Sequence, residues 1–166
     1  DGTRVALGRG ALSLARVAWF HLRGERSGYV VVVSDRTPMH ATARTLAGQG
    51  ATVAVAARRK DRLDELAAQI DGLAIEADVT DREQAVAAVE RTARELGRLD
   101  IVINNAGVML LGPIVDAPVE EWDRMIALNL NGLLYVAHAA LPHLLRAAEQ
   151  EPRRVADLVN VSSVAG

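Results

Sequence analysis

The feature that most constrains the fold is a regular alternation of short apolar runs with longer amphipathic runs, which begins at residue 29 of the 166-residue sequence. Continuous apolar runs of this length are typical of strands that are buried on both faces of a sheet. Successive runs are joined by connections long enough to hold a helix, which favours parallel pairing. The five apolar runs lie at 30–33, 51–57, 73–77, 99–103 and 155–161.

We therefore predict an α/β fold, namely a Rossmann-like, doubly wound parallel sheet of five strands in the order 3-2-1-4-5. Thr80 and Glu83 have the spacing of a capping box, so we expect Thr80 to be the N-cap of the helix that follows. The last helical segment covers about 119–148, with a possible break around 129–132. We assign residues 29–166 to this single Rossmann-like domain.

The composition excludes several classes of function. The formal net charge is −2, so no overall positive field would attract nucleic acid or anionic lipid. The sequence has no cysteine, which rules out disulfides and thiolate zinc sites and suits the reducing cytoplasm. The histidines have no metal-binding spacing, and no apolar run approaches the ~20 residues of a membrane span. We expect a cytoplasmic protein that binds no metal, no nucleic acid and no membrane.

Residues 1–28 differ in composition from the rest of the chain. They carry an excess of arginine over acidic residues, whereas residues 29–166 are net acidic. The segment is compatible with a targeting helix, an additional helix or sequence foreign to the domain. We leave residues 1–28 as an unassigned basic segment.

Ligands of doubly wound sheets bind beyond the carboxyl ends of the strands. Four of the predicted strands are followed there by polar or small residues, which are Arg58, Asp78, the run Asn104-Asn105-Ala106-Gly107, and Ser163. Each has a plainer explanation, because Arg58 could belong to a solvated loop, Asp78 could end its strand, and Asn and Gly are common in turns. Their coincidence at strand ends is what indicates a site.

Asn129 lies inside an apolar helical stretch rather than at a strand end. A buried amide without partners would cost about 1–3 kcal/mol. Asn129 is therefore either a residue that breaks or caps the helix, or part of a site.

Arg58 bears on the nature of the ligand. At this position after the second strand, an acidic side chain would bind the ribose 2′-hydroxyl of NAD, and an arginine would accommodate the 2′-phosphate of NADP. The preceding residue, Ala57, offers no carboxylate. If the site binds a dinucleotide, its charge favours NADP over NAD.

Four motifs in the sequence resemble those of the short-chain dehydrogenase/reductase family. They are ADVTD (77–81), NNAG (104–107), the Asn129 of ALNLNG, and NVSSVAG (160–166), in the family's order and at similar spacings. The resemblance covers about residues 29–166. It implies an NAD(P)-dependent oxidoreductase that transfers hydride between the nicotinamide and a small-molecule carbonyl or alcohol substrate. A complete member of the family is expected to be a homo-oligomer.

The resemblance also implies roles for the residues that would bind the cofactor. Asp78 would bond the adenine amine, and the Val79 amide would bond a ring nitrogen. Asn104 would be structural and close to the cofactor. Ala106 and Gly107 would lie against the ribose.

Two further residues would take part in catalysis. Asn129 would hold a water of the proton relay, and Ser163 would orient the substrate carbonyl, with Ser162 as the alternative register. The family also uses a Tyr-x-x-x-Lys pair beyond this serine, whereas the sequence ends at Gly166. We therefore expect an amino-terminal portion whose sheet is incomplete at its carboxyl end and which is inactive alone. The alternative is a non-catalytic Rossmann-type domain that binds a nucleotide or a protein.

The connector after the first strand departs from the family pattern, because the family's glycines fall on Val33, Thr37 and Met39. Those glycines allow a tight turn and a close approach of the backbone to the pyrophosphate. A valine resists positive φ, and the other two side chains occupy space that phosphates need. We predict that restoring glycine at 33, 37 and 39 tightens NADPH binding in a fluorescence titration. An unchanged affinity would mean that the connector is not a pyrophosphate loop.

Overall fold

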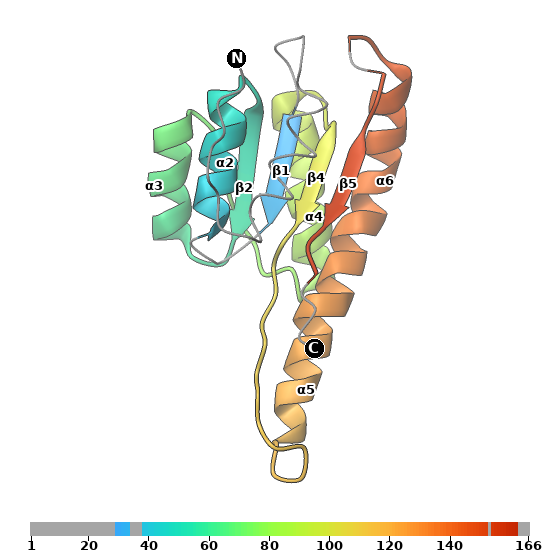
Figure 1. The fold of residues 1–166 in the computed structure, drawn as a ribbon. Coiled ribbons are helices and arrows are strands. Elements are labelled where there is room, and N and C mark those ends of the chain that lie inside the picture. Colours follow the sequence, from blue (N-terminus) through green and yellow to red (C-terminus); the bar gives the residue numbers. More distant parts are fainter. Residues whose placement is uncertain (1–28, 34–37, 153, 163–166) are drawn as a thin grey trace, which may run out of the picture.

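The computed structural model describes residues 29–33, 38–152 and 154–162, which form a parallel sheet covered by helices (Figure 1). The sheet has the order β3-β2-β1-β4-β5, and every neighbouring pair is parallel. The predicted fold class and strand order are therefore confirmed. The strands are β1 (Tyr29–Val33), β2 (Thr52–Ala57), β3 (Leu73–Glu76), β4 (Ile101–Asn104) and β5 (Asp157–Asn160).

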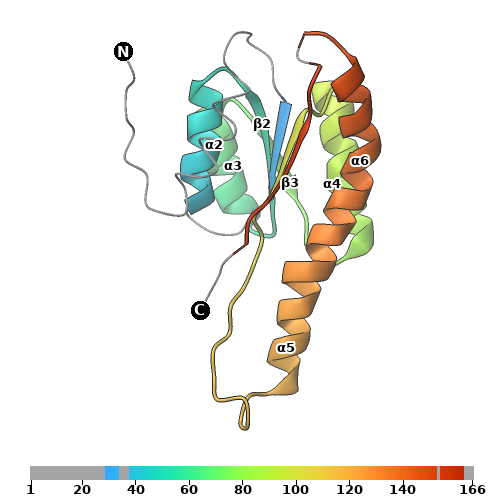
Figure 2. The same cartoon turned by 45° about the vertical axis from the view of Figure 1, so that its right-hand side comes forward.

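Helices cover both faces of the sheet, as Figure 2 shows, with α2 and α3 on one side and α4 and α6 on the other. The possible break predicted around 129–132 is a π-helical segment, so the helical stretch from α5 to α6 continues without a gap. The helical elements are α2 (Pro38–Gly48), α3 (Lys60–Ile70), α4 (Arg82–Leu96), α5 (Val119–Ile126), η1 (Ala127–Gly132) and α6 (Leu133–Glu149).

The apolar strand runs divide their side chains between two cores. In β2, Val53 and Val55 pack into the cluster on the α2–α3 side, whereas Ala54 belongs to the cluster on the α4–α6 side. In β4, Ile101 and Val102 alternate in the same way. Because both faces are buried, successive residues must all be apolar, which explains the continuous runs in the sequence.

Gly72 fixes the return of the chain from α3 into β3. The helix ends at Asp71, which adopts a left-handed conformation with φ 49°. A Cβ at position 72 would lie 2.5 Å from the backbone oxygen of Val53, which is closer than real Cβ atoms approach. The close packing of this turn on β2 therefore requires glycine.

The start of α4 differs from the sequence prediction. The N-cap is Asp81, whose Oδ1 accepts hydrogen bonds from the backbone N–H groups of Glu83 and Gln84 at 2.9 and 3.1 Å. The Thr80 hydroxyl instead donates to Asp78 at 2.8 Å. The capping-box prediction was wrong by one residue because Asp78 competes for the threonine.

Arg98 holds the far end of α6 against the sheet. Its Nε donates to Asp100 at 2.7 Å, and Asp100 is fully buried. Its Nη2 and Nη1 donate to the backbone oxygens of Ala147 and Glu151 at 3.1 and 2.6 Å. A cation at this position interacts favourably with the carbonyl groups at the C-terminal end of a helix.

The loop after β4 and helix α5 extend away from the sheet, and we call residues 105–126 the arm (Figures 1 and 2). No residue of α5 is buried. By length and composition alone, the stretch Val119–Glu149 could cross a membrane, and it is the one such helix among the residues described. A core helix of a globular protein meets the same criterion, and α6 packs on α4 and β4. The length and apolar composition of this stretch are therefore only weak evidence for a membrane span.

Asp81 gives a test of the helix start. Hydrogen bonds from Gln84, first through its backbone and then its side chain, hold the pKa of Asp81 below its ordinary value. Its contribution is therefore complete above the unfolded-state pKa and is lost as the pH falls through the lowered folded-state value. We predict that Asp81→Ala lowers the urea midpoint at pH 7 and that the deficit shrinks in acid. Asp81→Asn keeps a capping oxygen without titrating. If its urea midpoint fell as far as that of Asp81→Ala, Asp81 would not be the N-cap of α4.

Candidate functional site

The carboxyl ends of the strands surround a cavity of about 700 Å³. The register explains this, because Ala57 at the end of β2 pairs with Glu76 at the end of β3, and Val33 pairs with Asn104. The segments that leave these strands therefore start from one edge. The cavity is lined by residues of four segments, which are Ala56–Arg59, Ala77–Thr80, Ala106–Val108, and Arg124, Ala127 and Leu128.

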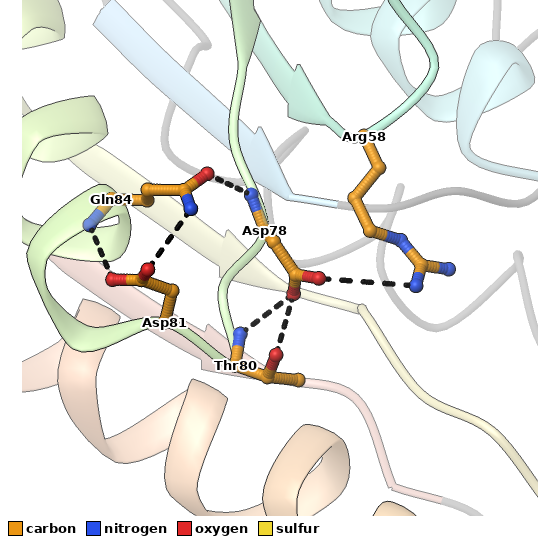
Figure 3. A network of polar contacts seen from close by, with 5 residues as sticks. All are labelled: Arg58, Asp78, Thr80, Asp81 and Gln84. Carbon is orange, nitrogen blue, oxygen red and sulfur yellow. Dashed lines mark hydrogen bonds and ion pairs between the residues drawn. The ribbon is translucent and has the colours of Figure 1, made fainter.

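Asp78 is fixed by a network that joins the end of β3 to the start of α4 (Figure 3). Its Oδ1 accepts from the backbone N–H and the hydroxyl of Thr80 at 3.0 and 2.8 Å. Its own N–H donates to Oε1 of Gln84 at 3.0 Å, and Nε2 of Gln84 donates to Asp81 at 3.0 Å. The carboxylate is thus held at the cavity with its second oxygen turned towards Arg58.

Arg58 lies across the cavity edge from Asp78. The distance from Nη1 to Oδ2 is 4.0 Å, and the side chains are 49% and 35% exposed. An exposed ion pair of this length contributes roughly 0–1 kcal/mol. The ion pair places the guanidinium at the edge of the cavity. Arg59 and Arg124 also line the cavity, which gives it more cationic than anionic side chains.

Asn104 joins the carboxyl ends of β4 and β5. It is 5% exposed, and its Nδ2 donates to Oδ1 of Asn160 at 3.0 Å. Its backbone oxygen accepts from Val161 at 2.8 Å, which extends the pairing of β4 with β5. Asn160 is a partner of Asn104 that the sequence did not indicate.

Asn129 binds the loop after β4. Its Oδ1 accepts from the N–H of Val108, and its Nδ2 donates to the oxygen of Val108, both at 2.8 Å. A Cβ at Gly107 would lie 3.4 Å from the same Oδ1, so the loop backbone passes close to the amide. Asn129 neither breaks nor caps the helix, because it lies in the third position of the π-helical segment and holds the cavity wall.

Ser163 lies outside the residues that the structure describes. Ser162, the alternative register, is exposed and is not among the residues that line the cavity. The predicted cofactor-binding residues Arg58, Asp78 and Val79 line one cavity together with Ala106 and Gly107. Within the described ranges, no three histidine or carboxylate side chains gather as metal ligands would.

Thr80 and Arg124 are site residues that sequence reasoning missed. Thr80 stands two residues after Asp78, the spacing at which an aspartate side chain accepts bonds from the following backbone. Arg124 stands four residues before Leu128, so both lie on one helix face. That spacing could have placed Arg124 at the cavity once Asn129 was singled out.

Comparison with known proteins agrees with this geometry. The family model described as short chain dehydrogenase matches residues 29–166. An uncharacterised oxidoreductase of Staphylococcus aureus (strain MRSA252) is 40% identical over 129 residues, which cover 76% of this chain and 53% of that protein. The chain belongs to the short-chain dehydrogenase family. It spans about half the length of the curated relatives it matches.

Solved structures have the same fold. A double mutant of a Serratia marcescens short-chain dehydrogenase/reductase aligns with a TM-score of 0.67 and 32% identity, covering 72% of this chain and 52% of that chain. The 3-ketoacyl-(acyl-carrier-protein) reductase of Brucella melitensis, in complex with NADH, aligns with a TM-score of 0.72 and 25% identity, covering 82% and 57%.

Proposed function

We propose that the whole protein is a cytoplasmic, NADP-dependent oxidoreductase that transfers hydride between the cofactor and a small carbonyl or alcohol substrate. Family membership supports the oxidoreductase class. The observation that carries the cofactor proposal is the cavity at the strand ends, with Arg58 on one side and Asp78 on the other. The absence of cysteine suits a reducing compartment.

The cavity fits the adenosine half of a dinucleotide. Its walls are mainly small apolar residues, which leave room for a flat ring, and its polar groups are few and lie at the rim. The Asp78 carboxylate uses one oxygen for Thr80 and keeps acceptor capacity for an adenine amine. We assign the Val79 amide to a ring nitrogen, and Ala106 and Gly107 to the ribose.

Arg58 would bind the 2′-phosphate. A guanidinium presents several donors in a fixed plane and suits a phosphate better than a hydroxyl. Its ion pair with Asp78 places it at the edge of the cavity. The Brucella neighbour was solved with NADH, so the preference of this chain for NADP rests on Arg58 alone.

The nicotinamide ring, when bound, supplies or accepts the hydride. The residues of this chain would position it and manage the proton. The Oδ1 and the Nδ2 of Asn129 each make one hydrogen bond with Val108. Oδ1 can accept, and Nδ2 can donate, one more bond to a water of the proton relay. Ser163 would orient the substrate carbonyl.

Two observations weigh on how this 166-residue chain behaves by itself. Val33, where the family has a glycine, continues the regular pairing of β1 with β2 and β4. Neither Tyr29 nor Tyr135 is followed four residues later by a lysine. We therefore propose that the chain alone binds the cofactor weakly and turns over no carbonyl. A non-catalytic nucleotide-binding domain is the second candidate, and the glycine-free connector favours it.

The cofactor preference is tested by titrating the chain with NADPH and NADH in separate fluorescence experiments. We expect NADPH to bind more tightly, and Arg58→Ala to weaken NADPH about tenfold while leaving NADH unchanged. The magnitude follows because a hydrogen bond to a charged group contributes about 1.5–3 kcal/mol, less when exposed, and 1.4 kcal/mol is tenfold.

Arg62→Ala is the matched control, because Arg62 is an exposed arginine of the neighbouring helix that does not line the cavity. If both variants lost the same NADPH affinity, Arg58 would act only through the overall charge of the protein. Equal affinities for NADPH and NADH in the unchanged chain would contradict the NADP proposal. Binding of neither nucleotide would contradict the cofactor proposal as a whole.

We also propose that the protein is a homo-oligomer, because apolar side chains remain exposed along the helical stretch from α5 to α6. They are spaced three, four or seven residues apart, which is one or two helical turns, so they form one stripe. Exposed apolar surface of this extent usually marks a contact. The stripe consists of Val119, Trp122, Ile126, Leu130, Leu134, Leu141 and Leu145, which are 38–65% exposed.

Light scattering tests this proposal. We predict species larger than the 17.7 kDa monomer, and a shift towards the monomer in Leu134→Glu, because a charge in the stripe would have to be desolvated on association. Gln150→Glu adds the same charge beyond the stripe and should change nothing. A monomer in the unchanged chain would refute the proposal.

A further inference from the structure

Gly132 lets the π-helical segment η1 lie directly against the cavity wall that follows β3. Gly132 is buried. A Cβ at this position would lie 3.1 Å from the backbone oxygen of Val79 and 3.2 Å from its Cγ2. These distances are tighter than nine in ten real Cβ contacts, so any side chain would force Val79 or η1 to move by a few tenths of an ångström.

The same segment holds the wall that follows β4. Asn129, three residues before Gly132, makes both of its 2.8 Å hydrogen bonds to Val108. Two bonds from one rigid amide to one residue require close alignment, because hydrogen bonds weaken steeply as their angles bend. A small displacement of η1 therefore acts on Val108 as well as on Val79.

We propose that Gly132 is a positioning residue, whose missing side chain sets the spacing between the two cavity walls at Val79 and Val108 through η1. The cavity between these walls is where the adenosine of the cofactor would bind, so the functional part of this proposal rests on the proposed function. The structural part, that Gly132 aligns Asn129 with Val108, stands independently of any ligand.

The π-helical form of η1 agrees with this role. π-helical turns are rare, and they occur mostly as single turns within α-helices, frequently at functional sites. Here the six residues of η1 lie between α5, which has no buried residue, and α6, which is packed on the sheet. Within η1, Gly132 lies against Val79 and Leu128 packs against the core on the α4–α6 side, so η1 is the segment from which the helix leaves the body of the fold.

The proposal is tested with two glycine substitutions of the same chemistry. In Gly132→Ala the new methyl meets the backbone oxygen of Val79. In Gly72→Ala it meets the backbone oxygen of Val53, which lies near the amino end of β2, at the edge of the sheet opposite to the cavity. Both variants should lose stability to urea. Only Gly132→Ala should disturb Val108.

The first measurement is the hydrogen-exchange rate of the Val108 amide, followed by NMR without nucleotide. We expect Gly132→Ala to accelerate it about tenfold, the effect of losing one ordinary hydrogen bond, and Gly72→Ala to leave it unchanged. Unchanged exchange in Gly132→Ala, or equal acceleration in both variants, would overturn the proposal.

If Gly132→Ala does not fold, the double variant Gly132→Ala with Val79→Ala removes the Cγ2 contact. Normal Val108 protection in that variant supports the proposal, and exchange as fast as in an Asn129→Ala variant contradicts it.

The second measurement is binding of adenosine 2′,5′-bisphosphate, which needs only the adenosine part of the cavity. We expect Gly132→Ala to weaken it several-fold and Gly72→Ala to leave it unchanged, and equal affinities in the two variants would refute the link to the cavity. If the unchanged chain does not bind this probe, the proposed cofactor site is wrong. The exchange measurement then still decides whether Gly132 aligns Asn129 with Val108.

Discussion

The rest of the structure depends on the parallel pairing of five strands, whose register brings their carboxyl ends to one edge. Parallel pairing requires crossover helices, and the helices bury both faces of the sheet. Backbone groups that leave the sheet at this edge cannot continue the ladder, so they take side chains as partners. The backbone N–H groups of Asp78 and Val108 have such partners, and both residues line the cavity.

The cavity therefore follows from the topology of the sheet, and side-chain hydrogen bonds fix the loops that form its walls. Gln84 ties the loop after β3 to α4, and Asn129 ties the loop after β4 to the helical stretch opposite. The charged side chains of Arg58 and Asp78 at the cavity edge are more exposed to solvent, at 49% and 35%. Rigid walls with an adaptable charged rim suit a ligand that is flat at one end and anionic at the other.

The sequence was sufficient to predict the fold class, the strand order and five of the fourteen residues that line the cavity, because apolar runs and strand-end residues are local signals. Local competition was harder to judge, since Thr80 satisfies the capping pattern but bonds Asp78 instead, which leaves the N-cap to Asp81. The partner of Asn129 could not be predicted, because Val108 is 21 residues away and only tertiary structure brings the two together. The contact of Gly132 with Val79 is of the same kind.

The arm described above has a mechanical consequence. A helix rises 1.5 Å per residue, so Val119 lies about 16 Å from the middle of η1. A tilt of roughly 10° at that point would displace Val119 by about 3 Å. The backbone N–H of Leu110 contacts the sulfur of Met125 at 3.5 Å, so the loop is linked to the same helix. The π-helical segment therefore connects the cavity walls to the arm, which carries Val119, Trp122 and Ile126 of the exposed apolar stripe.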